Sequence, residues 1–303
     1  MKYHVPKQFV TQKDLELVTE LLFVYPILSK QAKDYINNNR FWESGIFNDN
    51  LHIEYANETD CDYFVLPFKF ISSLETRFLE VLNLARKHGK KLICLNNDDF
   101  GGDYNVPEDV ILFRTSFYAS ERKKNEFAFP VFIPDIKKLS SGFCYNVSVG
   151  FCGDSNRPIR KEALAELKKG DIPVNHEEVF SFYQNPSVDK RKGREKFLNN
   201  LQNNIFILCP RGCGNFSYRF YETMCFGRIP IFINTDAVLP FENLIDYKSL
   251  VVFVEEKELH LLPQKMKEYC KNNDLMEKQE KCREIWETYL SPQGFINNIS
   301  SLL

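Results

Sequence analysis

The residues best suited to chemistry lie in one loop and the helix that follows it, in the second half of the chain. Arg211 and Gly212 come directly after the apolar run 205–209, whose length and following proline predict a buried strand. Ser217 stands where a helix N-cap is expected, and Arg219 follows on the first turn. Backbone N–H groups at a helix start attract anions, and the two arginines add positive charge beside them. The stretch therefore predicts a binding site for a nucleotide diphosphate.

The same helix carries a carboxylate one turn further on. Glu222 lies on nearly the same face as Arg219, where it could accept hydrogen bonds from ribose hydroxyls. Gly227 is expected to end the helix, and residues 229–233 form the next predicted strand. Strand, glycine loop, helix and strand make half of a doubly wound sheet, which binds ligands at the carboxyl ends of its strands. The candidate binding residues of this stretch are Cys209, Pro210, Arg211, Gly212, Asn215, Ser217, Arg219 and Glu222.

A second anion site is predicted earlier in the same half. Gly153 follows a predicted strand at 148–151, and Arg157 and Arg160 flank the start of a helix predicted over 159–169. Positive charge at a helix N-terminus opposes the helix dipole, so an anion bound there would be favoured. A plain basic helix terminus is the alternative explanation. Gly153, Arg157 and Arg160 are therefore further candidate binding residues.

These elements together resemble the signature of the exostosin family of glycosyltransferases, which reads C-x-R-G, then S-x-R-x-x-E, G-x-x-P and L-P-F-E. Each short element is weak alone, whereas the ordered set is fairly specific. A Rossmann-like half with a solvated arginine and glutamate is the simpler alternative, but it would not need the loop glycines and the L-P-F-E segment together. The matching residues are Cys209, Arg211, Gly212, Ser217, Arg219, Glu222, Gly227, Pro230, Leu239, Pro240, Phe241 and Glu242.

The resemblance implies an α/β fold of the GT-B type, in which two Rossmann-like domains face a central cleft. We expect residues 1–140 to form an acceptor-binding domain and residues 141–303 to bind the nucleotide sugar, with the last helix packing back on the first domain. The implied activity is inverting, metal-independent transfer of a sugar from a UDP-sugar to a glycan hydroxyl, which forms a β-linkage. UDP-sugar is then a substrate, and neither a cofactor nor a metal ion is expected. The transferred sugar, the acceptor and the oligomeric state stay open.

The catalytic base is sought in the first half, in the loop after a predicted strand at 91–95. Asp98 and Asp99 lie there, in a segment that resembles the family's H-D-W-G with Asp98 at the histidine position. A carboxylate at this edge of the sheet could take the proton from the attacking hydroxyl. A turn held by Asx-type hydrogen bonds explains the two residues equally well.

Two other readings of the chain remain. A fucosyltransferase of the α1,3 type would use GDP-fucose on the same architecture, but Thr223 stands where its donor segment has a lysine. A carbohydrate-binding protein that kept the fold and lost the base is the second alternative. Asp60 and Asp62 suggest a metal site, yet they precede a strand and would lie at the opposite edge of its sheet from a ligand.

Composition narrows the class of protein. The chain has 303 residues, 44% of them hydrophobic and 26% charged, which is typical of a globular protein large enough for two domains. A formal net charge of −2 gives no reason to expect nucleic acid as a partner. Nine scattered cysteines indicate reduced thiols. With neither a signal peptide nor an apolar run long enough for a transmembrane segment, the sequence predicts a cytoplasmic protein, as a bacterial or viral relative of the family would be. The resemblance leaves a trimmed Golgi enzyme as the alternative.

Several further elements are predicted from periodicity and turn residues. Helices are expected over 14–28, 29–40, 74–88 and 194–203, and two more, over 258–269 and 275–289, close the chain. Strands are expected at 3–5, within the stretch 60–68 that resembles a family strand, and at 110–113, 129–133 and 250–254. The break between the two halves is placed near residues 135–143, after Pro134.

Overall fold

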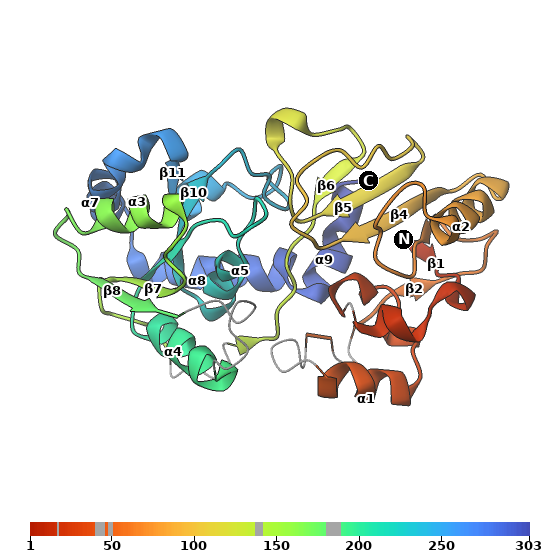
Figure 1. The fold of residues 1–303 in the computed structure, drawn as a ribbon, viewed down its shortest axis with the longest axis horizontal. Helices are drawn as coiled ribbons and strands as arrows, with labels where there is room; N and C mark the ends of the chain where they lie inside the picture. The colour runs from red at the N-terminus through yellow and green to blue at the C-terminus, as the bar shows by residue number, and fades with distance from the viewer. Residues whose placement is uncertain (17, 40–45, 48–50, 137–141, 180–188) are drawn as a thin grey trace.

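The structure is a computed structural model that describes residues 1–16, 18–39, 46–47, 51–136, 142–179 and 189–303. Its strands form two separate sheets, one from each half of the chain, which lie side by side in Figure 1. Every strand pairing in both sheets is parallel. The predicted α/β architecture of two Rossmann-like halves is therefore confirmed. The predicted boundary between residues 140 and 141 lies outside the described residues.

The N-terminal sheet has six strands in the order β2-β1-β3-β4-β5-β6. Side chains of β4 alternate between two cores: Leu92 and Cys94 pack with the face covered by α2, while Ile93 and Leu95 pack into the larger core on the other face. A parallel sheet covered on both faces needs such strands, apolar throughout. The elements are β1 (Lys2–His4), α1 (Lys30–Asn39), β2 (Glu54–Tyr55), β3 (Tyr63–Val65), α2 (Thr76–Lys87), β4 (Lys91–Asn96), β5 (Val110–Arg114) and β6 (Glu126–Ala128).

The C-terminal sheet has five strands in the order β11-β10-β9-β7-β8. In β9, Phe206 and Leu208 pack into one core while Ile207 and Cys209 pack into the other. The strands are β7 (Val149–Gly153), β8 (Val174–Glu178), β9 (Phe206–Cys209), β10 (Ile229–Asn234) and β11 (Val252–Glu255). The helices are α3 (Pro158–Leu167), α4 (Lys190–Gln202), α5 (Tyr218–Phe226), α6 (Tyr247–Leu250), α7 (Leu262–Asn272) and α8 (Leu275–Ile285).

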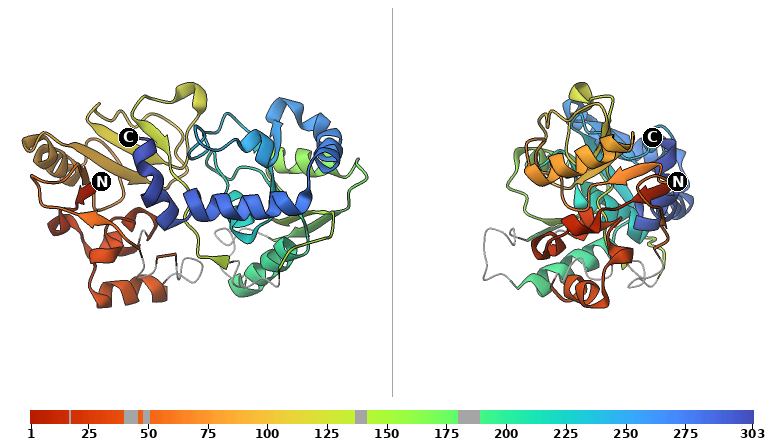
Figure 2. Two further views of the ribbon diagram at one scale, coloured as in Figure 1. Left: turned by 180° about the vertical axis from the view of Figure 1, so that it is seen from behind. Right: turned by 90° about the vertical axis from the view of Figure 1, so that its right-hand side faces the viewer.

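The end of the chain returns to the N-terminal sheet. Helix α8 runs along the back of the molecule, and α9 (Pro292–Asn298) follows it beside the N-terminal half, as the left view of Figure 2 shows. The Phe295 ring packs edge-on against Phe113 at 5.3 Å and Phe129 at 5.4 Å between ring centroids. Arg283 of α8 also pairs with Asp135 at 2.8 Å. The prediction that the helix over 275–289 closes the chain was wrong, because α9 follows it.

Two other predicted elements were wrong, each for a physical reason. Where residues 14–28 are described, they form short 3₁₀ turns, at Gln12–Glu16, Val18–Leu21 and Tyr25–Ile27, instead of one α-helix. Five consecutive side chains, from Leu21 to Tyr25, are buried there, so this stretch lacks the alternation of buried and exposed faces that the predicted amphipathic helix requires. The predicted strand at 129–133 lies three residues late, because Pro130 cannot donate to a ladder and β6 ends at Ala128.

Candidate functional site

The loop after β9 and the start of α5 form the centre of the site. Ser217 occupies the N-cap position of α5, and Gly227 ends the helix with a φ of +70°, as predicted. The Ser217 side chain makes no capping hydrogen bond. The Gly212 N–H donates to the Phe216 carbonyl at 2.9 Å, which closes the loop on itself. The first-turn N–H groups of α5 therefore lie directly beside a compact loop at the carboxyl end of β9.

Arg219 extends from α5 to the end of β7. Its Nη2 donates to the Cys152 carbonyl at 2.8 Å, and its guanidinium lies 4.5 Å from the centre of the Phe151 ring. A side chain at Gly153 would have its Cβ only 2.6 Å from Arg219 Nη2. Gly153 thus leaves the space that Arg219 fills, which explains why the two belong to one site.

Arg160 and Arg157 come from the start of α3, on the other side of the same edge. Arg160 donates to the Asp154 carbonyl at 2.6 Å and to the Arg211 carbonyl at 3.2 Å, so it links the loops after β7 and β9. Arg157 Nη2 lies 2.7 Å from the Cys213 Sγ. The two predicted anion sites are therefore one cluster, built from Arg157, Arg160 and Arg219, and Arg160 joins it to the backbone of Arg211.

The charge of this arginine cluster is not neutralised by an ion pair within the part of the chain that the structure describes. None of the three guanidinium groups of Arg157, Arg160 and Arg219 forms such a pair there. Burial and then the neighbouring cations Arg219 and Arg157 lower the pKa of Arg160 to about 10, and burial also lowers the pKa of Arg219. The Nε atoms of Arg160 and Arg219 are buried and lack a hydrogen-bond partner. Guanidinium groups stay protonated at neutral pH, so the cluster gathers positive charge that an anion would stabilise.

Glu222 lies on the same helix as Arg219, and it has a partner in the protein. Its carboxylate pairs with Arg194 of α4, and only 13% of its side chain is exposed. Arg194 also lies 5.0 Å from the centre of the Phe197 ring. A role for Glu222 in ribose binding stays a prediction, and a bound ribose would have to share this carboxylate with Arg194.

Three other candidate residues of the loop lie inside the protein. Cys209 is buried beside Thr223, and burial raises the pKa of its thiol to about 12. Pro210 is also buried. The Asn215 side chain, 3% exposed, donates to the carbonyls of Phe117 at 3.0 Å and Thr235 at 3.1 Å. The structure therefore places Asn215 in the contact between the two halves, apart from the arginine cluster.

The two aspartates of the N-terminal half have different surroundings. Asp98 accepts hydrogen bonds from the Phe100 N–H, the Tyr104 hydroxyl and the Asn96 amide, and it lies 3.7 Å from the Lys69 Nζ. The bond from Phe100 is the Asx-type contact of a turn. Both oxygens of the Asp98 carboxylate are therefore already used to hold its own loop.

Asp99 faces the arginine-bearing loop. Its Oδ1 accepts a hydrogen bond from the Gly214 N–H at 3.0 Å, and Oδ2 has no partner among the described residues. A Cβ on Gly214 would lie 2.8 Å from the same Oδ1, so only glycine allows this approach. The structure thus brings Asp99 next to the loop that carries Arg211, with one carboxylate oxygen still available.

Residue types alone did not reveal the groups that join the two halves. Asn97 donates to the Tyr218 hydroxyl at 3.0 Å, and the Asn215 N–H donates to the Ser116 hydroxyl at 2.9 Å. The sequence does hold one signal for Ser116: polar residues follow the buried strand β5 at the same sheet edge as Asp99.

Other sequence-based expectations concern metals, thiols and membranes. All nine cysteines are free thiols. Asp60 and Asp62 precede β3, and Asp62 accepts a hydrogen bond from the Lys2 N–H at 2.8 Å. Over the described ranges, no group of three or more His, Cys, Asp or Glu side chains is arranged to hold a metal ion. No helix within those ranges has both the length and the apolar character that a bilayer crossing requires.

Comparison with known proteins finds similarity in the C-terminal half. Residues 147–269 match the exostosin GT47 domain, and this range contains the whole arginine cluster and Glu222. A probable glucuronosyltransferase 47 A of Physcomitrium patens is 39% identical over 83 residues, which are 27% of this chain and 18% of that protein. The exostosin-1 homolog of Caenorhabditis elegans is 32% identical over 90 residues, 30% of this chain and 23% of that protein. The matches therefore span less than a quarter of these relatives.

A solved structure with a comparable extent is a glycosyltransferase from Rickettsia africae ESF-5. The match covers 99% of this chain and 98% of that one, with 13% sequence identity and a TM-score of 0.45.

Proposed function

Because residues 147–269 match the exostosin GT47 domain, we propose that this protein is an inverting, metal-independent glycosyltransferase. It would move a sugar from a UDP-sugar to a glycan hydroxyl and form a β-linkage. The nucleotide sugar would bind at the carboxyl edge of the C-terminal sheet, and the glycan acceptor would bind at the facing edge of the N-terminal sheet.

The observation that carries the proposal is the unneutralised arginine cluster. A departing nucleotide diphosphate develops negative charge on its phosphate oxygens, and fixed cations at that position stabilise the transition state. Arg160 and Arg219 are held by backbone carbonyls, at 2.6 Å and 2.8 Å, so they need little rearrangement to present this charge. In this scheme guanidinium groups supply the positive charge that a divalent ion supplies in other transferases.

Asp99 is the proposed base. The acceptor hydroxyl gives its proton to the free Oδ2 while its oxygen forms a bond to the anomeric carbon. The bond from that carbon to the phosphate oxygen breaks at the same time, and its electron pair leaves with the UDP. Attack from the face opposite the phosphate inverts the configuration. The hydrogen bond from the Gly214 N–H to Asp99 supports this role, because it holds the carboxylate beside the loop that would bind the donor.

Thermal unfolding with a nucleotide panel tests the proposal. The panel contains UDP, GDP, CMP and their sugars, each with and without EDTA. A ligand at about 100 times its Kd stabilises the native state by about 2.7 kcal/mol, which a melting curve resolves. We expect UDP to raise the Tm with EDTA present and to lose this effect in Arg219→Ala. Arg86→Ala is the matched control, because Arg86 is an arginine of the N-terminal half already paired with Asp109.

Each result has a distinct meaning. A response to GDP alone would favour the fucosyltransferase alternative. Stabilisation by UDP without turnover of any UDP-sugar would favour a binding protein that lacks a base. The absence of a response to every nucleotide would contradict the proposed function.

A further inference from the structure

The segment that ends β5 holds the loop that carries Asp99. Arg114, Thr115 and Ser116 are consecutive and buried, with 1%, 5% and 1% of their surfaces exposed. Thr115 Oγ1 donates to the Asp98 carbonyl at 3.2 Å, and Ser116 Oγ donates to the Asp99 carbonyl at 3.2 Å. The backbone of the aspartate loop is therefore fixed by side chains from the neighbouring strand.

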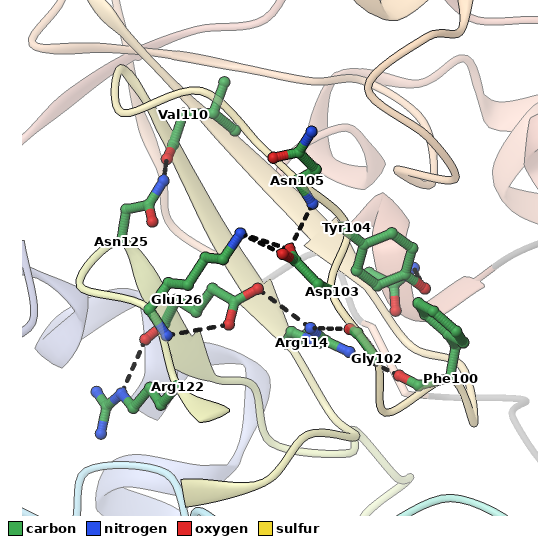
Figure 3. Close-up of polar contacts among 12 residues, drawn as sticks. Phe100, Gly102, Asp103, Tyr104, Asn105, Val110, Arg114, Arg122, Asn125 and Glu126 are labelled. Carbon is green, nitrogen blue, oxygen red and sulfur yellow. Dashed lines mark hydrogen bonds and ion pairs between the residues drawn. The ribbon is translucent and has the colours of Figure 1, made fainter. Parts of the chain in front are cut away.

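Arg114 anchors the far part of the same loop, as Figure 3 shows. Its Nη2 donates to the Phe100 carbonyl at 2.7 Å, and its Nη1 donates to the Gly102 carbonyl at 2.9 Å. Glu126 of β6 compensates the buried charge, with an N···O distance of 3.1 Å. The buried pair thus keeps the loop rigid, because breaking it would leave an unpaired charge in the core.

Ser116 differs from its two neighbours because it also contacts the other half of the molecule. A hydroxyl group can donate one hydrogen bond and accept others. The Ser116 hydroxyl donates to the Asp99 carbonyl and accepts from the Asn215 N–H at 2.9 Å. It is therefore a direct link between the aspartate loop and the loop after β9.

We propose that Ser116 is a positioning residue for the transfer reaction, a proposal that rests on the proposed function. Its hydroxyl and the bond from Gly214 to Asp99 Oδ1 fix the distance between the base and the donor loop. Catalysis by a positioned base depends steeply on geometry, since a shift of about 1 Å can reduce the rate about 100-fold. Ser116 touches no substrate and acts through Asp99 and Asn215.

A pair of isosteric variants tests the proposal. Ser116→Ala removes the link between the loops, whereas Thr115→Val, the matched control, removes a hydroxyl that contacts only the aspartate loop. UDP release is measured with UDP-xylose and UDP-glucuronic acid and a panel of oligosaccharide acceptors. Ser116→Ala should lower kcat about 10- to 100-fold and leave the donor KM within a factor of about 3, because it disturbs the base and not the arginine cluster.

Amide hydrogen exchange gives a readout that does not depend on activity. The Asn215 amide should exchange faster in Ser116→Ala and stay protected in Thr115→Val, because only the first variant removes its acceptor. Equal losses of kcat in the two variants, or wild-type kcat and wild-type Asn215 exchange in Ser116→Ala, would overturn the proposal while the proposed function stands. A wild-type protein that neither binds UDP nor turns over a UDP-sugar would overturn both.

Discussion

The carboxyl edges of the two sheets face each other, and they differ in whether their charged side chains have charged partners within the protein. At the edge of the C-terminal sheet, Arg160 and Arg219 are half-buried against backbone carbonyls and share no ion pair with described residues. At the edge of the N-terminal sheet, Asp98 is surrounded by donors and Arg114 is paired with Glu126. One edge leaves its charge without an ion pair among the described residues, and the other uses its charge to hold its own loops.

This difference affects the stability of the ligand-free protein. A buried charge without a partner costs stability in the ligand-free protein, and a paired one costs much less. The cost is tolerated where a bound anion removes it, so the arginine cluster is the stronger indication of function. Asp99 is the exception on the N-terminal edge, because only one of its carboxylate oxygens is used.

The largest expected effect is on the rate of sugar transfer, when Asp99 and Asp98 are substituted one at a time. Asp99→Asn should reduce sugar transfer about 10²- to 10⁴-fold, because an amide cannot take a proton but can still accept the bond from Gly214. UDP affinity, measured by calorimetry, should not change. Asp98→Asn should instead lower the unfolding free energy by about 1–3 kcal/mol and keep more of the activity, because its carboxylate holds the loop. The reverse pattern would assign the base to Asp98.

The next effect concerns phosphate recognition by the arginine cluster. Arg160→Ala should weaken UDP binding about 10- to 100-fold, as expected when a hydrogen bond to a charged group is lost. The affinity for uridine, which has no phosphate, should stay the same. Calorimetric titration with both ligands checks this prediction. An equal loss for uridine would mean that Arg160 supports the loop after β9 and does not bind the diphosphate.

Features of the fold that depend on neighbouring residues could be predicted from the sequence, and features that depend on distant residues could not. The helix from Tyr218 to Phe226 was predicted from local signals, a serine at its start and a glycine with positive φ at its end. The parallel sheets followed from alternating apolar runs and helices. The α-helix predicted over 14–28 was wrong because the side chains from Leu21 to Tyr25 all pack into the core, and this burial comes from distant parts of the chain that local periodicity cannot register.

The contacts of each candidate residue, more than its type, show whether it lies in the arginine cluster. The sequence placed Arg157, Arg160 and Arg219 near strand ends, and the structure joined them in one cluster. It could not show that Glu222 pairs with Arg194, or that Asn215 reaches Phe117 across a separation of 98 residues. The first contact depends on how α4 packs beside α5, and the second on how the two halves meet; no local pattern encodes either arrangement.

A smaller effect is expected at the outer part of the arginine cluster. Arg157 contacts the Cys213 Sγ and raises the electrostatic cost of Arg160. In Arg157→Gln the ligand-free protein should keep its stability or gain about 0.5 kcal/mol, the size of a removed like-charge contact, while the Tm shift caused by UDP shrinks. Urea unfolding and thermal shift measure the two quantities. A clear loss of stability without ligand would show that the cluster is not strained by its own charge.

The smallest effect should come from Glu242, which closes the L-P-F-E segment. Its carboxylate pairs with Arg122 of the N-terminal half at 2.7 Å, and both side chains are well exposed, at 48% and 31%. Exposed pairs of this kind contribute at most about 1 kcal/mol, so Glu242→Gln should change the unfolding free energy by less than that. UDP affinity should not change, because the carboxylate is already used to join the two halves. A tenfold loss of UDP affinity would instead place Glu242 in the donor site. The C-terminal edge would then bind its ligand with a carboxylate as well as with the arginine cluster.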